Sequence, residues 1–265
     1  MSGIHLHGHA HAQPHAHLAS DVPAWIASAD PRVKLVTALA MVVIAVSTPP
    51  ESFMAVACYF STFGLLAIWS RISPHVVLTR LVAVVPFVAM IALFVPFLPD
   101  PSGGGAGFGV GVLRVHRAGL VVFWNVLWKA SFGMLTLSLL TWTTPFERIL
   151  RALEELRAPP VLVMLTSFTY RYAFVLADEV VRMRRARDSR GWEGRTLAQA
   201  RTIGQMIAML FLRSYERAER IHLAMLARGY EGRPPRGAST PFRVLDWGIA
   251  AALLGLFVVF RLGVR

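Results

Sequence analysis

Residues 120–142 read LVVFWNVLWKASFGMLTLSLLTW, and this stretch decides the class of fold. It is apolar apart from small hydroxyl side chains, Asn125 and Lys129. A helix needs about 20 apolar residues to cross the hydrocarbon core of a bilayer, so the stretch predicts a transmembrane helix. Lys129 is a charge well inside that helix. Such a charge points either to a function or to a polar seam against other helices or a partner subunit.

Four other stretches have the same apolar character. The chain of 265 residues is 55% hydrophobic and 16% charged, whereas a soluble globular domain has about 25% charged residues. The single cysteine, Cys58, excludes an intramolecular disulfide, a Cys-based zinc site and a CxxC redox pair. We therefore predict an all-α integral membrane protein with about five transmembrane helices. The four further spans are about Val33–Ser47, Phe53–Trp69, Leu81–Leu98 and Val244–Leu262.

The basic charge is concentrated in one insertion before the last span. Residues 143–243 hold 18 of the 27 Lys and Arg residues and 10 of the 15 Asp and Glu residues of a chain with a net charge of +12. Because basic residues mark the cytoplasmic side of membrane proteins, we expect this insertion and the N-terminus to be cytoplasmic. The expected organisation is a His-rich cytoplasmic tail (1–30), a four-span membrane domain (31–142), an amphipathic helical cytoplasmic domain (143–243) and a final transmembrane helix (244–265).

The N-terminal tail is rich in histidine. Neutral imidazole is a good ligand for Ni, Co, Cu and Zn, and short His-rich tracts bind such ions. The intervening Gly, Ala and Pro residues favour loose collection of ions without a fixed geometry. The alternative is a tail with no role in the mechanism. The six histidines are His5, His7, His9, His11, His15 and His17.

The sequence contains no recognisable catalytic motif. The glycine-rich run 103–109 lacks the Gly-Lys-Ser/Thr ending of a phosphate-binding loop, and we expect it to be a flexible turn. His-Glu-x-x-His and Gly-x-Ser-x-Gly are also missing, and no paired carboxylates share a helix face inside the membrane. We therefore predict a non-catalytic chain that does not hydrolyse ATP by itself.

A repeat lies within the basic insertion. Residues 178–195 (DEVVRMRRARDSRGWEGR) and 216–233 (ERAERIHLAMLARGYEGR) align without gaps at an offset of 38 residues, and 7 of the 18 positions are identical. Each copy is typical of a long helix stopped by a glycine just past its C-terminus. An arginine then lies in the last turn, beside the partial negative charge of the helix end.

A single helix end of this kind would be interpreted as an ordinary charged helix C-cap. The presence of a second copy favours a functional role for both ends. An exposed arginine preceded by a small alanine suits insertion into a groove, because the planar guanidinium can bond carboxylates or helix-end carbonyls bidentately. Two matching ends therefore predict two similar partners. The equivalent positions are Ala186 and Ala224, Ser189 and Ala227, Arg190 and Arg228, and Gly191 and Gly229.

The run 161–177 is apolar apart from Arg171. It could form a sixth span, but it continues directly into the charged stretch 178–190. This continuation favours one long helix packed beneath the membrane domain. Whether 161–177 or the apolar stretch 203–212 enters the membrane stays open at this point.

The order of these features resembles that of the T component of energy-coupling factor transporters, and most closely its cobalt-type family, CbiQ. The resemblance covers roughly Asp30 to Leu262. Its features are four spans, Thr-Thr-Pro-Phe-Glu at 143–147, a short Leu-rich helix, Pro159-Pro160, Arg171-Tyr172, two Ala-x-x-x-Arg-Gly helix ends and a last span.

The resemblance implies a membrane scaffold of an ATP-driven cobalt importer, placed between a substrate-binding membrane subunit and two ABC-type ATPases. The helix ends would dock in grooves of the ATPases through the motifs Ser189-Arg190-Gly191 and Ala227-Arg228-Gly229. The substrate subunit would be CbiM-like, with a small CbiN-like subunit as an optional addition. ATP and Mg would bind to the ATPases and cobalt to the substrate subunit, which leaves no cofactor on this chain. The location would be the inner (cytoplasmic) membrane of a bacterial cell.

Three alternatives remain. Nickel-type T components share these features, so the ion is cobalt or nickel. A self-sufficient metal channel or carrier would need ligands along a pore, and the spans offer almost none beyond Asn125, Lys129 and scattered Ser and Thr. A nucleic-acid-binding protein tethered to the membrane is disfavoured, because acids and apolar stripes interrupt the arginines. We therefore expect the lipid bilayer and protein subunits, and no nucleic acid, as partners.

Overall fold

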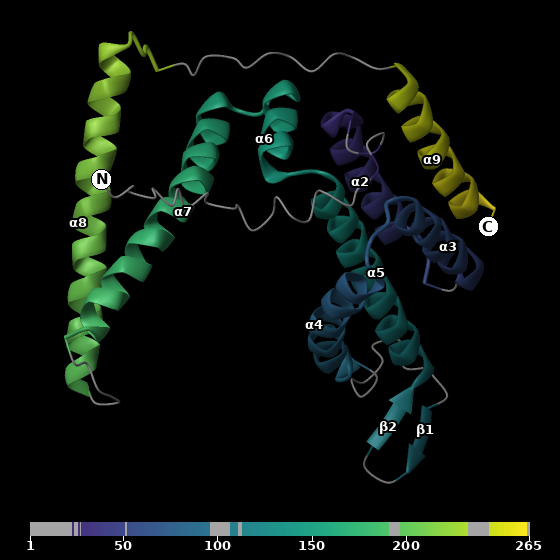
Figure 1. Ribbon diagram of the computed structural model, residues 1–265. Coiled ribbons are helices and arrows are strands. Elements are labelled where there is room, and N and C mark those ends of the chain that lie inside the picture. Colours follow the sequence, from purple (N-terminus) through teal and green to yellow (C-terminus); the bar gives the residue numbers. More distant parts are fainter. Residues whose placement is uncertain are drawn as a thin grey trace, which may run out of the picture. The chain divides into compact units, whose positions relative to one another are not determined.

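The computed structural model describes residues 23, 26, 28–50, 52–95, 107–110, 113–190, 197–232 and 244–263. Within these residues the chain forms eight helices and one β-hairpin (Figure 1). The chain divides into two compact units. The first, here called the membrane unit, comprises Met1–Ala152 and Thr240–Arg265, and the second, the arm unit, comprises Leu153–Ser239.

The membrane unit contains most of the helices. Its short helix α6 begins in this unit and ends in the arm unit. The arm unit contains the two longest helices, α7 (Pro160–Asp188) and α8 (Leu197–Ala227). The helices of the membrane unit are α2 (Pro31–Val46), α3 (Phe53–Trp69), α4 (Pro74–Ala92), α5 (Arg117–Thr143), α6 (Phe146–Glu155) and α9 (Val244–Leu262).

The all-α membrane class predicted from the sequence is confirmed. Helices α3 and α9 have the predicted bounds, and α2 and α5 agree with prediction to within a few residues. Helix α4 begins at Pro74 and not near Leu81, because Pro74 occupies the first helical turn, where its fixed φ favours helix. The last predicted residues of that span, 96–98, lie outside the described residues.

The lengths and apolar composition of the helices identify those that could each cross a bilayer. Among the described residues, four helices are long and apolar enough, namely α4, residues 119–143 of α5, α7 and α9. Helices α2 and α3 have 16 and 17 residues, which places them at the lower end of the range of about 17 to 25 residues for a spanning helix. Helix α7 qualifies because its first half is apolar, although its second half is highly charged.

The core of the membrane unit is aromatic. Helix α5 contacts α2, α3 and α4, and α9 contacts α2 and α3. The side chains of Tyr59, Phe132 and Phe257 are completely buried where α3, α5 and α9 meet. The rings of Tyr59 and Phe257 are stacked with centroids 4.7 Å apart, and Phe132 lies 5.9 Å from Tyr59 and 6.0 Å from Phe257. These contacts anchor α9 against α3 and α5.

A short polar network adjoins this core. The hydroxyl of Thr48, which follows α2 in sequence, lies 3.1 Å from the hydroxyl of Tyr59. The Tyr59 hydroxyl also donates to the carbonyl oxygen of Phe257 at 3.5 Å. The ammonium of Lys129 donates to the carbonyl oxygens of Val46 (2.7 Å) and Thr48 (3.0 Å). Lys129 therefore faces a polar seam inside this chain, one of the two interpretations left by the sequence.

A β-hairpin precedes α5. Strand β1 (Gly107–Val110) pairs antiparallel with β2 (Leu113–His116), with Gly107 opposite His116. The expectation of a flexible turn is therefore wrong for residues 107–109, whose backbone pairs with a second strand. Residues 103–106 of the glycine-rich run lie outside the described part of the chain.

Candidate functional site

The arm unit holds the residues singled out by the repeat. Helices α7 and α8 run antiparallel, because two contacts fix their register. Glu179, in the second half of α7, forms an ion pair with Arg213, near the middle of α8. Near the start of α7, the hydroxyl of Tyr230 donates to the sulfur of Met164 at 3.2 Å. The C-terminal ends of α7 and α8 therefore point in opposite directions.

A small groove lies where α7 and α8 contact each other. It has a volume of about 150 Å³ and is lined by Val175, Leu176 and Glu179 of α7. The residues of α8 that line it include Arg213, Glu216 and Arg217. The groove therefore surrounds the ion pair that joins the two helices.

Each helix carries its arginine beyond the contact between the two helices. From the ion pair of Glu179 with Arg213, Arg190 lies 11 residues further along α7 and Arg228 lies 15 residues further along α8. At 1.5 Å per residue these separations are about 17 Å and about 22 Å along the helix axes. The pair therefore presents two arginine ends that point in opposite directions.

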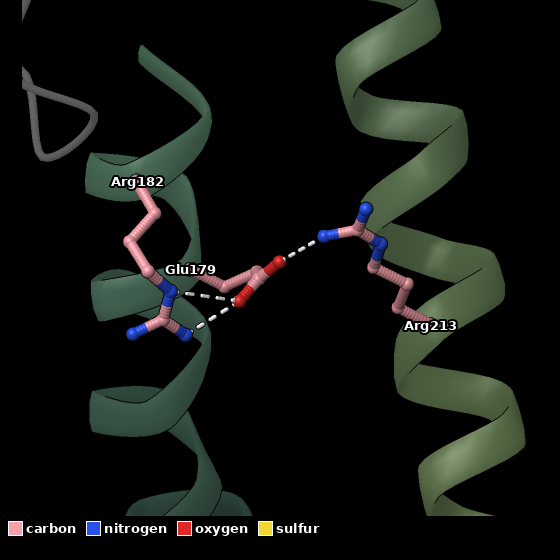
Figure 2. A network of polar contacts seen from close by, with 3 residues as sticks. All are labelled: Glu179, Arg182 and Arg213. Atoms are coloured by element: carbon pink, nitrogen blue, oxygen red, sulfur yellow. Dashed lines mark hydrogen bonds and ion pairs between the residues drawn. The ribbon is translucent and has the colours of Figure 1, made fainter. Parts of the chain in front are cut away.

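The contact between the arms centres on one carboxylate. Figure 2 shows Glu179 of α7 between Arg182 of the same helix and Arg213 of α8. Arg182 Nε donates to Glu179 Oε2 at 3.1 Å, and Arg213 donates to Oε1. These hydrogen bonds, and then the positive charges of the two guanidinium groups, hold the pKa of Glu179 below its usual value. Glu179 belongs to the charged half of α7, which has too many ionic side chains to lie in hydrocarbon.

The C-terminal end of α8 has the capping geometry that the sequence predicted. Gly229 has a φ of +81°, in the left-handed region that favours glycine. The N–H of Gly229 donates to the carbonyl of Leu226 (2.9 Å), and that of Tyr230 donates to the carbonyl of Met225 (3.0 Å). This is the Schellman arrangement, and it makes Arg228 the last residue before the chain turns away from the helix axis.

The C-terminal end of α7 has a matching turn as far as the chain is described. The N–H of Arg190 donates to the carbonyl of Arg187 at 3.1 Å. At the equivalent place in α8, the N–H of Arg228 donates to the carbonyl of Met225 at 3.0 Å. Gly191, the predicted stop of the first copy, lies outside the described residues.

Both arginine ends are open to solvent. Ala186 lies one turn before Arg190 on the same helix face, and Ala224 has the same relation to Arg228. Among the described residues, neither Arg190 nor Arg228 has an ion pair or side-chain hydrogen bond, so their donors are free for an acceptor on another chain. The exposed motif residues are Ala186, Ser189, Arg190, Ala224, Ala227, Arg228 and Gly229.

Two contacts of the arm unit were missed by the sequence analysis. The ion pair between Glu179 and Arg213 joins residues 34 positions apart, and the Tyr230 hydroxyl contacts Met164 from 66 positions away. The one available signal was the repeated aromatic residue after each Arg-Gly, of which Tyr230 is the second example.

Metal ligands do not gather in the described part of the chain. No group of three or more His, Cys, Asp or Glu side chains placed to hold a metal ion occurs there. The six histidines proposed as a loose collector, His5, His7, His9, His11, His15 and His17, lie outside the described residues. The ion-collecting hypothesis therefore stays a prediction.

These features define the class of the protein. It is an all-α integral membrane protein with a separate antiparallel helix pair that presents duplicated arginine ends. The chain belongs to the CbiQ family, whose sequence model, described as "Cobalt transport protein", matches residues 23–241. The predicted resemblance to T components of energy-coupling factor transporters is thereby confirmed, and the relatives agree with it.

Three relatives illustrate the similarity. The energy-coupling factor transporter transmembrane protein EcfT of Bacillus selenitireducens is 28% identical over 247 residues, which is 89% of this chain and 90% of the relative. An uncharacterized protein of Methanocaldococcus jannaschii is 25% identical over 209 residues, covering 77% of this chain and 76% of the relative. A putative fused cobalt transport protein CbiMQ of Methanocorpusculum labreanum is 27% identical over 217 residues, which is 80% of this chain and 34% of that longer protein.

Proposed function

We propose that this chain is the non-catalytic coupling subunit of an ATP-driven cobalt importer. Its partners are two copies of an ABC-type ATPase and a substrate-binding membrane subunit of CbiM type. The observation that carries the proposal is the relation between Arg190 and Arg228. They occupy equivalent positions at the exposed C-terminal ends of the two repeat copies, which suits docking to two identical subunits.

The chemistry of docking follows from the helix ends. Each guanidinium offers several donors in a rigid plane, which suits a groove lined by carboxylates or helix-end carbonyls. The small side chains of Ala186 and Ala224 let the partner approach the helix one turn before each arginine. Charge reversal at either arginine would therefore place a carboxylate against acceptors and repel the partner.

The geometry of the membrane unit supports our proposal for its orientation. The start of α2, the end of α5 and the start of α9 are joined by hydrogen bonds at one end of this unit. Lys34 and Arg148 lie near these helix ends, and Arg80 donates to Thr141 close to the end of α5. Because basic residues favour the cytoplasmic side, we place this end, the N-terminus and the arm unit in the cytoplasm. We therefore take α7, whose second half is highly charged, not to cross the bilayer. The membrane is the inner membrane of a bacterial cell.

The mechanism is a shift between two populations. ATP binding brings the two ATPases together and moves the ends of both arms. Helices α7 and α8 contact each other at Glu179 and Arg213, so movement of one end changes the angle between the helices. The change is passed to the membrane unit, where it tilts or releases the substrate subunit. Such a shift requires that the contacts of the arms with the ATPases differ between nucleotide states.

The test uses the complete complex in proteoliposomes. The double variant Arg190→Glu and Arg228→Glu is compared with Arg184→Glu and Arg201→Glu, which changes the net charge equally at exposed positions of the same helices. We expect the first to abolish ATP-dependent uptake of labelled cobalt and the second to keep it. Normal uptake by the first variant would exclude the proposed coupling role.

Two further samples in the same experiment test the alternative functions. Labelled nickel in place of cobalt distinguishes the two ions, and we expect the wild-type complex to import cobalt in preference. This chain reconstituted alone, without ATPases, tests the self-sufficient channel or carrier, and we expect no metal uptake in that sample.

A further inference from the structure

The end of the membrane unit that leads to the arm unit holds a cluster of charged residues. Asp30 precedes α2, Lys34 lies one turn into it, Asp246 lies in the first turn of α9, and Arg148 lies in α6. These residues lie near the places where the chain leaves the membrane unit, within α6, and returns to it, shortly before α9. Any force from the arm unit along the chain therefore reaches this cluster first.

Asp30 ties the starts of two helices together. Its Oδ1 accepts a hydrogen bond from the N–H of Arg32 at 2.9 Å and so caps α2. Its own N–H donates to Asp246 Oδ2 at 2.8 Å. The two N-termini carry partial positive charges that repel each other, and the carboxylates of Asp30 and Asp246 offset this repulsion. A shift of the start of α9 therefore pulls on the start of α2.

Lys34 ties the same place to the end of a third helix. Its ammonium donates to the carbonyl oxygen of Ile26 at 2.5 Å and, over a longer distance of 3.4 Å, to that of Thr143, the last residue of α5. The end of α5 carries a partial negative charge, which a cation stabilises. The positive charge of Arg148 in α6 repels the ammonium of Lys34. A displacement of α6 therefore changes the electrostatic repulsion that this ammonium experiences.

Asp30 also offers the ammonium a second position. The side chain of Asp30 is only 4% exposed, and its Oδ2 has no hydrogen-bond partner among the described residues. A buried carboxylate oxygen without a donor is costly. Asp30 and Lys34 are four residues apart on one helix face, so the ammonium can turn from Thr143 to Asp30 Oδ2 when the end of α5 withdraws.

We propose that Lys34 is a positioning residue that transmits movement of the arm unit to α2 and α9. It bonds the carbonyls of Ile26 and Thr143 in the state described here, and it exchanges Thr143 for Asp30 Oδ2 in the state in which α5 has moved. The proposal rests on the coupling function proposed above. It adds the place at which the movement enters the membrane unit.

The test measures labelled cobalt imported per ATP hydrolysed by the complete complex in proteoliposomes. Lys34→Met should keep the ATPases bound and active but lower this ratio by about fivefold or more, the lower end of typical coupling energies between sites. Lys129→Met is the matched control, because Lys129 also donates to carbonyls at a helix end, but at the opposite end of α2. We expect the control to keep the wild-type ratio.

A second variant guards against misfolding of the first. Asp30→Asn keeps the helix cap, because asparagine caps as well as aspartate, but it removes the negative charge offered to Lys34. It should also lower the ratio of cobalt to ATP. A wild-type ratio in Asp30→Asn, or equal ratios in Lys34→Met and Lys129→Met, would overturn the proposal. A wild-type complex that fails to couple ATP to uptake would instead overturn the function itself, and this inference with it.

Discussion

Lys129 of α5 donates a hydrogen bond to the carbonyl oxygen of Val46, at the C-terminal end of α2, at a distance of 2.7 Å. A second bond goes to Thr48 at 3.0 Å. The positive charge thus neutralises the negative end of a helix dipole and satisfies carbonyls that have no partner within their own helix. The cost of placing this lysine in an apolar helix is offset, because Lys129 fixes the C-terminal end of the neighbouring helix α2.

Replacing Lys129 with methionine should destabilise the membrane unit. The variant loses two charge-assisted hydrogen bonds and leaves helix-end carbonyls unpaired, which predicts a loss of about 1.5 to 3 kcal/mol in the free energy of unfolding. Chemical denaturation in detergent measures this loss. Ser131→Ala is the control, because its hydroxyl bonds a carbonyl of its own helix. Equal stability of the two variants would contradict the capping role.

The aromatic core gives a second prediction. Phe257 of α9 is completely buried and stacks on Tyr59 of α3. Phe257→Ala leaves a cavity at this contact and should cost about 3 to 5 kcal/mol of unfolding free energy. Val259 lies on the same helix with 62% of its surface exposed, and Val259→Ala should change the stability little. Similar losses in both variants would show that α9 is not anchored through Phe257.

Two glycines of the arm unit should respond to alanine with opposite signs. Gly229 has a φ of +81°, and a Cβ there meets no neighbour, so Gly229→Ala costs only backbone strain of about 1 to 2 kcal/mol. Gly204 lies inside α8 with open space around it, so Gly204→Ala should stabilise the helix by about 0.5 to 1 kcal/mol. Thermal denaturation of the two variants measures both effects. Stabilisation by Gly229→Ala would contradict the left-handed helix end.

The carboxylate of Glu179 predicts that the contact between α7 and α8 depends on pH. Because Arg182 and Arg213 hold the pKa of Glu179 below its usual value, the ion pair is fully present above the usual carboxyl pKa of about 4.3. It is lost as the pH falls through the lower pKa of the folded state. Spin labels on cysteines introduced at Ala186 and Ala224, with Cys58→Ser, report the distance between the arms. We expect that distance to be constant between about pH 8 and 5 and to broaden in stronger acid.

The same labels test the pair by mutation. Glu179→Gln should broaden the distance distribution at every pH, because neutral glutamine no longer holds both arginines. Glu216→Gln is the matched control, since Glu216 pairs with Arg220 of its own helix across 3.9 Å. An identical effect of the two substitutions would show that Glu179 does not join the arms.

The sequence predicted the class of fold because apolar stretches of this length have few alternatives. The bounds of α3 and α9 follow from polar residues at their ends. The start of α4 was placed too late because Arg80 reads as a boundary, whereas its guanidinium donates to Thr141 at 3.0 Å and stays within the helix. A long basic side chain can reach a polar partner without ending an apolar helix.

The partners of the charged residues could not be predicted. Lys129 and Val46 are 83 residues apart in sequence, and their contact depends on the packing of α5 against α2. The candidate site could be predicted more readily, because a repeat with an arginine at each helix end can be recognised in the sequence without knowledge of the tertiary packing. The antiparallel arrangement that points Arg190 and Arg228 in opposite directions could be established only from the contacts of Glu179 and Tyr230.

The most direct test counts the ATPase subunits bound to this chain. Native mass spectrometry of the complex purified without nucleotide should show two ATPases on the wild-type chain, since each arm presents one arginine. Arg190→Glu alone and Arg228→Glu alone should each leave one ATPase, and the double variant should leave none. Two bound ATPases on the double variant, or no ATPase on the wild-type chain, would contradict the proposal that the two arginine ends are equivalent docking sites.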